Sequence, residues 1–409
     1  MRVTRVRLEN YKGFKSFEHS FNPGINVLFG ANGSGKTSTL RAIVTILSWY
    51  ISRIKTATGS GKSITIDSIH NEENQASIIL ETEADQLQQT VLIKKRNGRE
   101  TGAKSNLADL SKWATTYRLR RASGEKIIYP LFAFYGVHRA VLDIPIRIRG
   151  KFNPEPLQGY EQALDGGSNF RAFFQWFRWR EDIENEEKND TPQYRDRDLE
   201  CVRNAWAVFM PELSNFRIRR RHQALTAIKD GIELSISQLS DGEKCLLALV
   251  GDIARRISLL HMESSEDAST LLKNATGIIL IDELDLHLHP RWQRRAIIGL
   301  SEVFPNIQFI ISTHSPSIIS ELPAEQLINL EQPDSGNYGF GLSVAEVSEH
   351  VMQAELWPKA IKQIIDKVES SISNEDAKSA ANALSELKQL LPADAPIITE
   401  LETEINLFV

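Results

Sequence analysis

The segment Gly30–Thr37 constrains the fold of this chain more than any other feature. It reads GANGSGKT and stands between a short apolar run and a helical pattern. The run Ile25–Phe29 before it is typical of a buried strand, and Ser38–Ser52 after it has apolar residues at helical spacing. A glycine-rich turn from a strand into a helix directs backbone N–H groups and the positive helix end at one point. The pattern G-x-x-x-x-G-K-[ST] in this setting predicts a phosphate cradle, and the alternative is an ordinary glycine-rich turn.

Polar residues follow two other apolar runs. Asp282 and Glu283 follow Ile278–Ile281, and His314 comes shortly after Ile310-Ile311. Ligands bind at the carboxyl ends of such strands in α/β sheets. We therefore expect Asp282 to hold Mg²⁺ through water and Glu283 to orient or deprotonate the attacking water. His314 is predicted to contact the γ-phosphate. The alternative for each run is a strand that ends in a polar turn.

A second helix start of small residues occurs at Leu239–Lys244, which reads LSDGEK. The N-terminus of a helix is a site for anions. Because Gly30–Thr37 is already a full cradle for one nucleotide, we expect this second fragment to serve the nucleotide of another copy. The sequence therefore predicts a homodimer or higher homo-oligomer joined through its ATP sites.

Alternating strand and helix patterns after residue 230 predict an α/β fold with a parallel sheet. Shorter alternating runs near the N-terminus predict an antiparallel flap, and the middle and the end of the chain are mostly helical in pattern. The expected division is 1–100, 101–230, 231–345 and 346–409, that is, an N-terminal lobe, a mostly helical insertion, a C-terminal lobe and a helical extension. The expected strands are 1–9, 17–21, 25–29, 64–66, 76–81, 91–95, 127–135, 232–236, 277–281 and 307–312. The expected helices are 38–52, 105–119, 169–188, 194–209, 241–261, 290–303 and 315–321, with a break at Pro392 in the extension.

Composition limits the remaining classes. The 409 residues are 41% hydrophobic and 25% charged, which suits a globular chain with one large or two interleaved domains. The net charge of −5 gives no global basic excess, so nucleic-acid binding would rest on local patches. Two cysteines, no apolar leader at the N-terminus and no apolar run of about 18 residues predict a reducing, cytoplasmic setting without a membrane span.

Together these motifs resemble those of ABC-type P-loop ATPases of the SMC and RecF kind. Gly30–Thr37 matches Walker A, Leu239–Lys244 the signature motif, Asp282-Glu283 Walker B, Leu284-Asp285 the D-loop and His314 the switch histidine. The signature departs from LSGGQ, which points away from transporters, and Gln75 is the candidate Q-loop glutamine. The resemblance implies ATP and Mg²⁺ as cofactors, with the signature motif of one copy capping the ATP of the other. The residues that it implies are Glu283 and His314 for catalysis, Thr37 and Asp282 for the metal, and for the nucleotide Gly30, Asn32, Gly33, Gly35, Lys36, Thr37, Ser38, Ser240, Gly242 and Asp285.

Three further stretches are similar to one branch of that family. They are Asp282–Pro290, Tyr135–Arg139 and Ser312–Pro316. All three resemble the stand-alone ATPases of bacterial phage-defence operons, including the Septu and retron-associated ones. That resemblance implies a partner nuclease encoded by an adjacent gene. No acidic cluster suited to a metal nuclease follows His314, so we expect the nuclease to be a separate protein.

Weaker signals leave alternatives open. The basic run Arg217–His222, with Arg147–Arg149, favours either a phosphate backbone or a solvated face paired with the acidic stretch 181–190. The aromatic residues of 170–179 favour a core stripe over base stacking, although Trp176 and Trp179 could instead face a partner. His287 and His289 are interpreted as packing or helix-start residues rather than metal ligands. Leu384, Leu387, Leu390, Leu391 and the apolar end 405–409 could pack on the head or dock a partner.

Three functions are compatible with these sequence features. The leading prediction is an ATPase that controls a nuclease in anti-phage defence. A RecF-like repair ATPase that clamps DNA is the second, and DNA-stimulated turnover that Arg219→Glu abolishes would favour it. The third is a nucleotide-binding scaffold with negligible hydrolysis, for which wild type and Glu283→Gln would release phosphate equally slowly.

Overall fold

The computed structural model describes residues 1–84, 86–96, 104–137, 154–221, 224–331, 339–355, 357–392 and 394–408. The chain forms two compact units, Met1–Gly341 and Leu342–Val409. The four-part division expected from the sequence stays an interpretation. Within the described residues, no helix is both long and apolar enough to cross a bilayer.

The centre of the first unit is a five-stranded sheet in which every pair of neighbours is parallel, in the order β12-β3-β11-β10-β6. Its strands are almost continuous apolar runs with every residue buried, as expected for a sheet covered on both faces. The bounds are β3 Ile25–Phe29, β6 Leu131–Tyr135, β10 Gly277–Ile281, β11 Ile307–Ser312 and β12 Leu327–Asn329.

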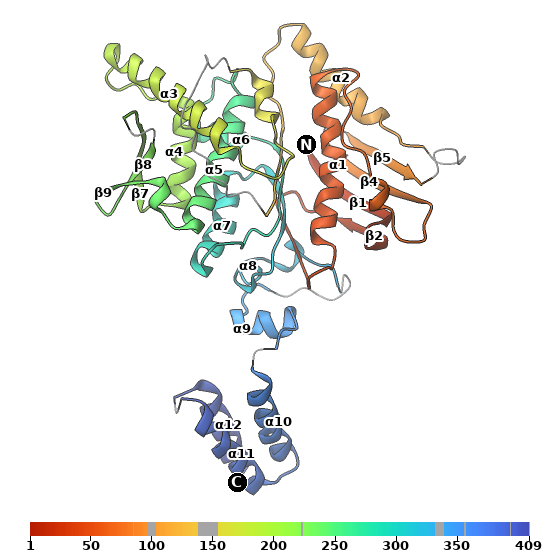
Figure 1. Ribbon diagram of the computed structural model, residues 1–409, viewed down its shortest axis with the longest axis vertical. Coiled ribbons are helices and arrows are strands. Elements are labelled where there is room, and N and C mark those ends of the chain that lie inside the picture. Colours follow the sequence, from red (N-terminus) through yellow and green to blue (C-terminus); the bar gives the residue numbers. More distant parts are fainter. Residues whose placement is uncertain are drawn as a thin grey trace. The chain divides into compact units, whose positions relative to one another are not determined.

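Helices cover this sheet on both sides. Helix α1 (Lys36–Lys55) lies on one side, and helices α4, α5 and α7 lie on the other (Figure 1). The bounds of the second group are α4 Arg197–Phe209, α5 Asp241–Leu260 and α7 Pro290–Val303, with the short helices α6 Ala268–Asn274 and α8 Pro316–Ile319. The parallel α/β core predicted from the sequence is confirmed. The two predicted phosphate-binding helix starts, those of α1 and α5, therefore belong to opposite layers.

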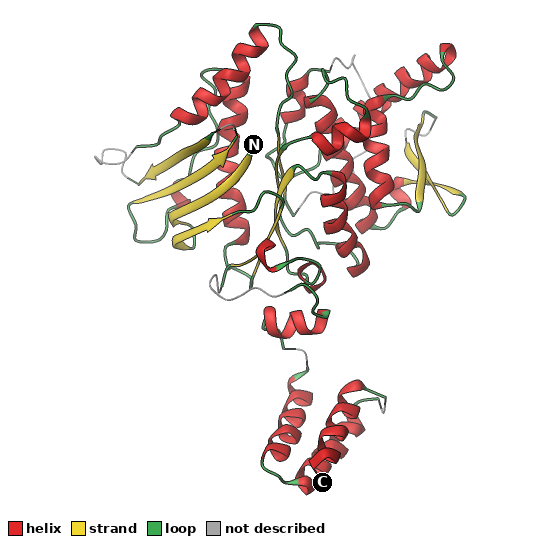
Figure 2. Cartoon of the chain, turned by 180° about the vertical axis from the view of Figure 1, so that it is seen from behind, coloured by secondary structure: helices red, strands yellow, loops and turns green. Residues whose placement is uncertain are grey.

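The antiparallel flap is also confirmed, as a four-stranded sheet in the order β2-β1-β4-β5 that lies beside α1 (Figure 2). Its strands are β1 Arg2–Tyr11, β2 Phe14–Ser20, β4 Gln75–Glu83 and β5 Leu87–Lys95, and α2 (Ala108–Ala122) packs against α1 and β5. The strand predicted at Ile64–Ile66 is wrong. Only Ile64 is buried there, and the backbone turns into a 3₁₀ helix at Ile66–Ser68, where the N–H groups of Ser68 and Ile69 donate to the carbonyl oxygens of Thr65 and Ile66.

A three-stranded antiparallel sheet, β7-β8-β9, adjoins the long helix α3 (Phe170–Asp190) and α4. Its strands are β7 Leu213–Arg219, β8 Ala224–Lys229 and β9 Ile232–Ser235. The aromatic stripe of α3 is a core stripe, because all of its members from 170 to 177 are buried, and Phe173 and Phe177 contact Trp206 of α4. The alternative that Trp176 faces a partner is wrong, since its side chain is fully buried.

The second unit contains α9 Val344–Glu346 and the longer helices α10 Lys359–Ser373, α11 Ala377–Leu390 and α12 Pro396–Phe408. Apolar faces of these three helices make a core of their own that includes Val368, Leu384, Leu387 and Leu401. The predicted break at Pro392 lies between α11 and α12. Leu390, which the sequence grouped with the buried leucines, is instead 57% exposed.

Candidate nucleotide-binding site

The glycine-rich turn after β3 has the backbone that a phosphate cradle needs. Gly30, Gly33 and Gly35 have φ angles of 139°, 87° and 101°, a region that residues with a side chain rarely adopt. Asn32 and Gly33 are exposed at the tip of the loop, and α1 starts directly after Gly35. The loop therefore presents backbone N–H groups and a helix N-terminus to solvent at one place.

A second constraint acts on Gly35. A Cβ atom at this position would lie 2.1 Å from Cζ of Phe14, the first residue of β2. The hairpin of β1 and β2 thus supports the loop from behind with an aromatic ring. A side chain at this position would strain the left-handed backbone and displace the ring of Phe14, so the loop favours glycine here.

Lys36 is held inside its own loop. Its Nζ donates hydrogen bonds to the carbonyl oxygens of Gly30 at 2.9 Å and Ala31 at 2.8 Å, and the residue is only 6% exposed. Burial lowers the pKa of Lys36, although nearby carboxylates, Glu283 first among them, partly oppose this shift. An anion beside the ammonium group would stabilise its charged form.

Glu331 contacts the glycine-rich loop, although no sequence motif predicts it there. Its Oε1 accepts the N–H of Ala31 at 3.0 Å, and its own N–H donates to Oδ1 of Asn329 at 2.9 Å. Glu331 follows β12, outside any motif, so no signal in the sequence points to it. The Glu331 carboxylate therefore accepts a hydrogen bond from the Ala31 N–H, a donor that a bound phosphate oxygen could also use.

Thr37 and Asp282 meet across the junction of α1 and β10. The Thr37 hydroxyl donates to Oδ1 of Asp282 at 3.1 Å, and Asp282 is 2% exposed. A hydroxyl and a carboxylate are oxygen ligands, which Mg²⁺ prefers, and Mg²⁺ takes few protein ligands when phosphates supply others. The pair therefore fits a Mg²⁺ ion that also binds a nucleotide. The described residues contain no cluster of three or more His, Cys, Asp or Glu arranged to hold a metal.

Ser312, the last residue of β11, holds both acidic residues that follow β10. Its hydroxyl donates to Oδ1 of Asp282 at 2.6 Å and accepts the N–H of Glu283 at 2.8 Å. Glu283 has a φ of 50°, so this hydrogen bond stabilises a left-handed backbone at a residue with a side chain. Ser312 lies in one of the motifs found in the sequence, but the motif alone indicates no role for its hydroxyl.

Asp285 brings His314 to the same sheet edge. The Thr313 hydroxyl donates to Oδ1 of Asp285 at 2.5 Å, and the His314 N–H donates to the same oxygen at 3.3 Å. The turns after β10 and β11 are therefore joined through the Asp285 side chain, at the sheet edge where the sequence predicted functional polar residues. Gln75, the Q-loop candidate, is exposed and begins β4 in the flap.

Ser240 is the N-cap of α5 and forms a capping box with Glu243. The Ser240 hydroxyl donates to Oε2 of Glu243 at 2.7 Å and accepts the Glu243 N–H at 3.3 Å. Gly242 packs closely, since a Cβ there would lie 2.6 Å from the carbonyl oxygen of His287. Within one copy, the signature motif thus lies against the turn that follows Asp282-Glu283.

His289 caps α7, because Nδ1 accepts the N–H of Arg291 at 3.4 Å. This confirms the interpretation of His289 as a helix-start residue. His287 has a φ of 64° in the preceding turn.

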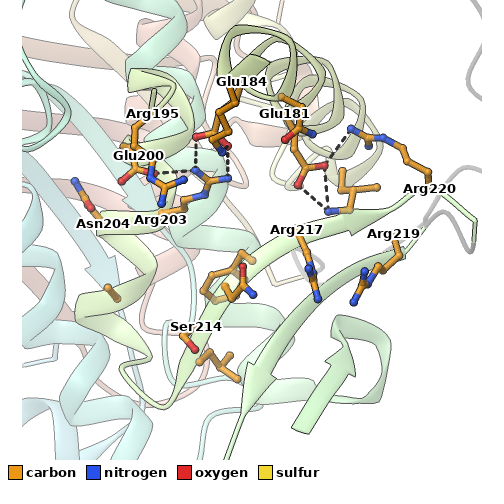
Figure 3. A pocket seen from close by; sticks show the side chains of 17 residues that line it. Glu181, Glu184, Arg195, Glu200, Arg203, Asn204, Ser214, Arg217, Arg219 and Arg220 are labelled. Carbon is orange, nitrogen blue, oxygen red and sulfur yellow. Dashed lines mark hydrogen bonds and ion pairs between the residues drawn. The ribbon is translucent and has the colours of Figure 1, made fainter. Parts of the chain in front are cut away.

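The basic run lies on β7 and in the turn after it, beside an open groove that α3, α4 and β7 line (Figure 3). Arg217 and Arg219 both pair with Glu233, and the Arg219 guanidinium lowers the pKa of Glu233 to about 2. Arg220 pairs with Glu181 and Asp182, which belong to the acidic stretch 181–190. These contacts favour the paired, solvated face over a free phosphate-binding strip. His222, His138, Arg139 and Arg147–Arg149 lie outside the described residues.

A glycine-rich loop between a buried parallel strand and a helix, with paired acids on a neighbouring strand, defines an ABC-type P-loop ATPase head. Residues 25–320 match the family described as "AAA domain, putative AbiEii toxin, Type IV TA system". The chain belongs to this family.

Curated relatives agree with the resemblance to phage-defence ATPases. The chain is 30% identical to the "Retron Vc95 probable ATPase" of Vibrio cholerae serotype O1 biovar El Tor, over 91% of this chain and 84% of the relative. It is 28% identical to the "Retron Ec83 probable ATPase" of Escherichia coli, over 99% and 87%. It is 22% identical to the "Septu protein PtuA" of Bacillus thuringiensis, over 99% and 98%. Among solved structures it is similar to "SMC head domain from Thermotoga maritima", with a TM-score of 0.44 and 17% identity over 80% of this chain and 94% of that one.

Proposed function

We propose that this protein binds and hydrolyses Mg-ATP, with two copies closed around two nucleotides, and thereby controls a partner nuclease in the cytoplasm during bacterial anti-phage defence. The observation that carries the proposal is the hydrogen bond from the Thr37 hydroxyl, just after the glycine-rich loop, to Oδ1 of Asp282, with the two oxygen atoms 3.1 Å apart. A Mg²⁺ ion bound there would neutralise phosphate charge. The residues proposed to hold the nucleotide within one copy are Gly30, Asn32, Gly33, Gly35, Lys36, Thr37 and Ser38.

Hydrolysis needs a water molecule aimed at the γ-phosphate. Glu283 is the proposed base that accepts a proton from this water or orients it. Its backbone is held by Ser312, which also holds Asp282, so one hydroxyl keeps the two acids in register. His314, held near Asp285 through its N–H, is proposed to donate a hydrogen bond to the γ-phosphate.

Two copies are proposed to share each nucleotide, with Ser240, Gly242 and Asp285 of one copy completing the site of the other. Lys36 begins α1 and Ser240 caps α5, and these helices lie on opposite sides of the central sheet. This placement supports the idea that each phosphate-binding helix start serves a different nucleotide. The partner nuclease is proposed from the similarity to retron and Septu proteins, and an adjacent gene is where we expect it.

The test uses Glu283→Gln, which keeps the shape of the side chain but removes the base. We expect this variant to hydrolyse ATP at most at about a hundredth of the wild-type rate and to accumulate as an ATP-bound dimer. Light scattering with and without Mg-ATP measures the dimer. Lys36→Ala in the same background is the control, because loss of the cation should abolish ATP binding and the dimer with it. A Glu283→Gln protein that stays monomeric at saturating ATP would contradict the proposal.

A further inference from the structure

The carboxylate of Glu243 lies one hydrogen bond from the serine proposed to meet a phosphate. Its Oε2 accepts both the N–H of Ser240 at 2.9 Å and the Ser240 hydroxyl at 2.7 Å, and the residue is 6% exposed. The hydroxyl proton of Ser240 is therefore directed at Glu243, and a negative charge stands directly behind the signature motif. An unpaired carboxylate at this place would repel an incoming phosphate.

A lysine from a different element neutralises that charge. Nζ of Lys229, the last residue of β8, lies 2.6 Å from Oε1 of Glu243. The lysine is fixed by the tight turn into β9, where Asp230 and Gly231 both have positive φ angles of 51° and 79°. The ion pair therefore ties the β7-β8-β9 sheet to the first turn of α5.

Both partners are stabilised in their charged forms. Burial would raise the pKa of Glu243, but the hydrogen bonds from Lys229 and Ser240 outweigh burial, and the pKa is lowered. The hydrogen bond to Glu243 raises the pKa of Lys229. Near neutral pH the two groups therefore form an ion pair, and the first turn of α5 carries no uncompensated negative charge from Glu243.

We propose that Lys229 is a positioning residue for the signature motif, which compensates Glu243 so that the first turn of α5, capped by Ser240, can receive the phosphate of a nucleotide bound to a second copy. The inference rests on the proposed function, because it assumes that Ser240 acts across a dimer. The inference adds Lys229 to the proposed site, a residue that lies outside every sequence motif and belongs to the β7-β8-β9 sheet rather than to the central sheet. In this proposal Lys229 acts through Glu243 and Ser240 and not by contact with the nucleotide.

The experiment measures ATP-driven dimerisation of the full chain by light scattering, in the Glu283→Gln background. Lys229→Met should raise the ATP concentration for half-maximal dimerisation about tenfold or more, because a buried carboxylate loses its cation. ATP binding to the dilute monomer, measured by calorimetry, should not change. Lys229→Arg should restore dimerisation to within about twofold of the background.

Two variants separate charge from packing. Lys188→Met is the control for loss of a lysine beside a buried carboxylate: Lys188 pairs with Glu184 at 3.0 Å, but Glu184 also pairs with Arg203, so its charge stays compensated; this variant should leave dimerisation unchanged. Adding Glu243→Gln to Lys229→Met should recover most of the loss, because the amide still accepts the Ser240 hydrogen bonds but has no charge.

Three outcomes would count against the inference. If the double variant dimerises as poorly as Lys229→Met, the lysine acts through packing and the inference is wrong. If Lys229→Met dimerises like the background, the inference alone fails. If the background itself does not dimerise, the proposed function fails and the inference falls with it.

Discussion

At the scale of single residues, Ser312 is a buried structural residue that holds two predicted functional acids through one hydroxyl group. It is fully buried, and its one hydroxyl serves Asp282 as a donor and Glu283 as an acceptor. Removal of the hydroxyl would leave the Glu283 N–H without this acceptor and Asp282 without a short hydrogen bond. Both predicted functional acids would then be less restrained, and shifts of a fraction of an ångström matter in catalysis.

Ser312→Ala is therefore expected to lower the ATPase kcat about 10- to 100-fold, equivalent to roughly 1–3 kcal/mol of lost hydrogen bonding. The affinity for ATP should change by less than about threefold, because the cradle is intact. Steady-state phosphate release and calorimetry measure the two quantities. Ser312→Thr should keep most activity, and Ser320→Ala, another buried serine of this region, is the control. Equal loss in Ser312→Thr would contradict a role for the hydroxyl.

His261 is a single residue that should make the stability of the folded chain depend on pH. Its ring is 1% exposed at the end of α5, and burial lowers its pKa to about 4, although the backbone at Tyr129 and the charge of Glu266 partly oppose this shift. The unfolded chain, with a His pKa near 6.5, binds more protons than the folded chain between about pH 6.5 and 4. Stability that is present at pH 7 is therefore lost as the pH falls through this window.

The expected loss from this one group is about 2 kcal/mol between pH 7 and pH 5. Urea unfolding at the two pH values measures it, and His261→Gln should show a pH dependence smaller by about that amount. The same pH dependence in both proteins would mean that His261 is not buried in its neutral form.

At the scale of elements, the start of α5 depends on a close approach to the turn after β10. Gly242 allows the helix to lie against the carbonyl of His287, 2.6 Å from where a Cβ would stand. This contact lies within one copy, so the glycine of the signature motif has a packing reason in addition to the phosphate contact proposed for it. A side chain at this position would push the backbone of α5 and Ser240 away from the turn.

Gly242→Ala is expected to destabilise the first unit by about 1–3 kcal/mol and to weaken ATP-driven dimerisation of the Glu283→Gln protein. A thermal melt and light scattering measure the two effects. Gly167→Ala serves as the control, because a Cβ there meets no atom within 4 Å. An unchanged melt in Gly242→Ala would show that the helix start accommodates a methyl group.

Strands with an almost continuous apolar run were predicted well. Ile25–Phe29 and Gly277–Ile281 have the bounds expected from the sequence, because such runs suit a strand in a sheet that is covered on both faces. Ile64–Ile66 failed because two isoleucines around one threonine are too few to outweigh local turn bonding.

The residues of the candidate site also differ in how far the sequence predicts them. Motifs identified Lys36 and its neighbours. Glu331, just after β12, and Lys229, at the end of β8, belong to no motif and contact the site only through the tertiary structure.

At the scale of the whole molecule, the two units differ in charge as well as in core. Residues 342–409 contain twelve Asp and Glu, five Lys and no Arg, so the second unit accounts for more than the whole net charge of −5. The global charge therefore describes neither unit. Leu384 and Leu387 of α11 pack in the second unit's own core. The two roles that the sequence offered for them were packing on the head and docking a partner.

Separate cores predict separate unfolding transitions. Leu387 is fully buried in the core of the second unit, and Leu387→Ala should destabilise that unit by about 2–5 kcal/mol through lost burial and the cavity left behind. Calorimetry of the full chain should show one transition moving to lower temperature while the transition of residues 1–341 stays in place. Phe174→Ala, in the core of the first unit, should move the other transition instead. Leu407→Ala is the control, because this side chain on α12 is 84% exposed and its loss should move neither. A single transition that shifts with both core variants would mean that the two units unfold cooperatively as one.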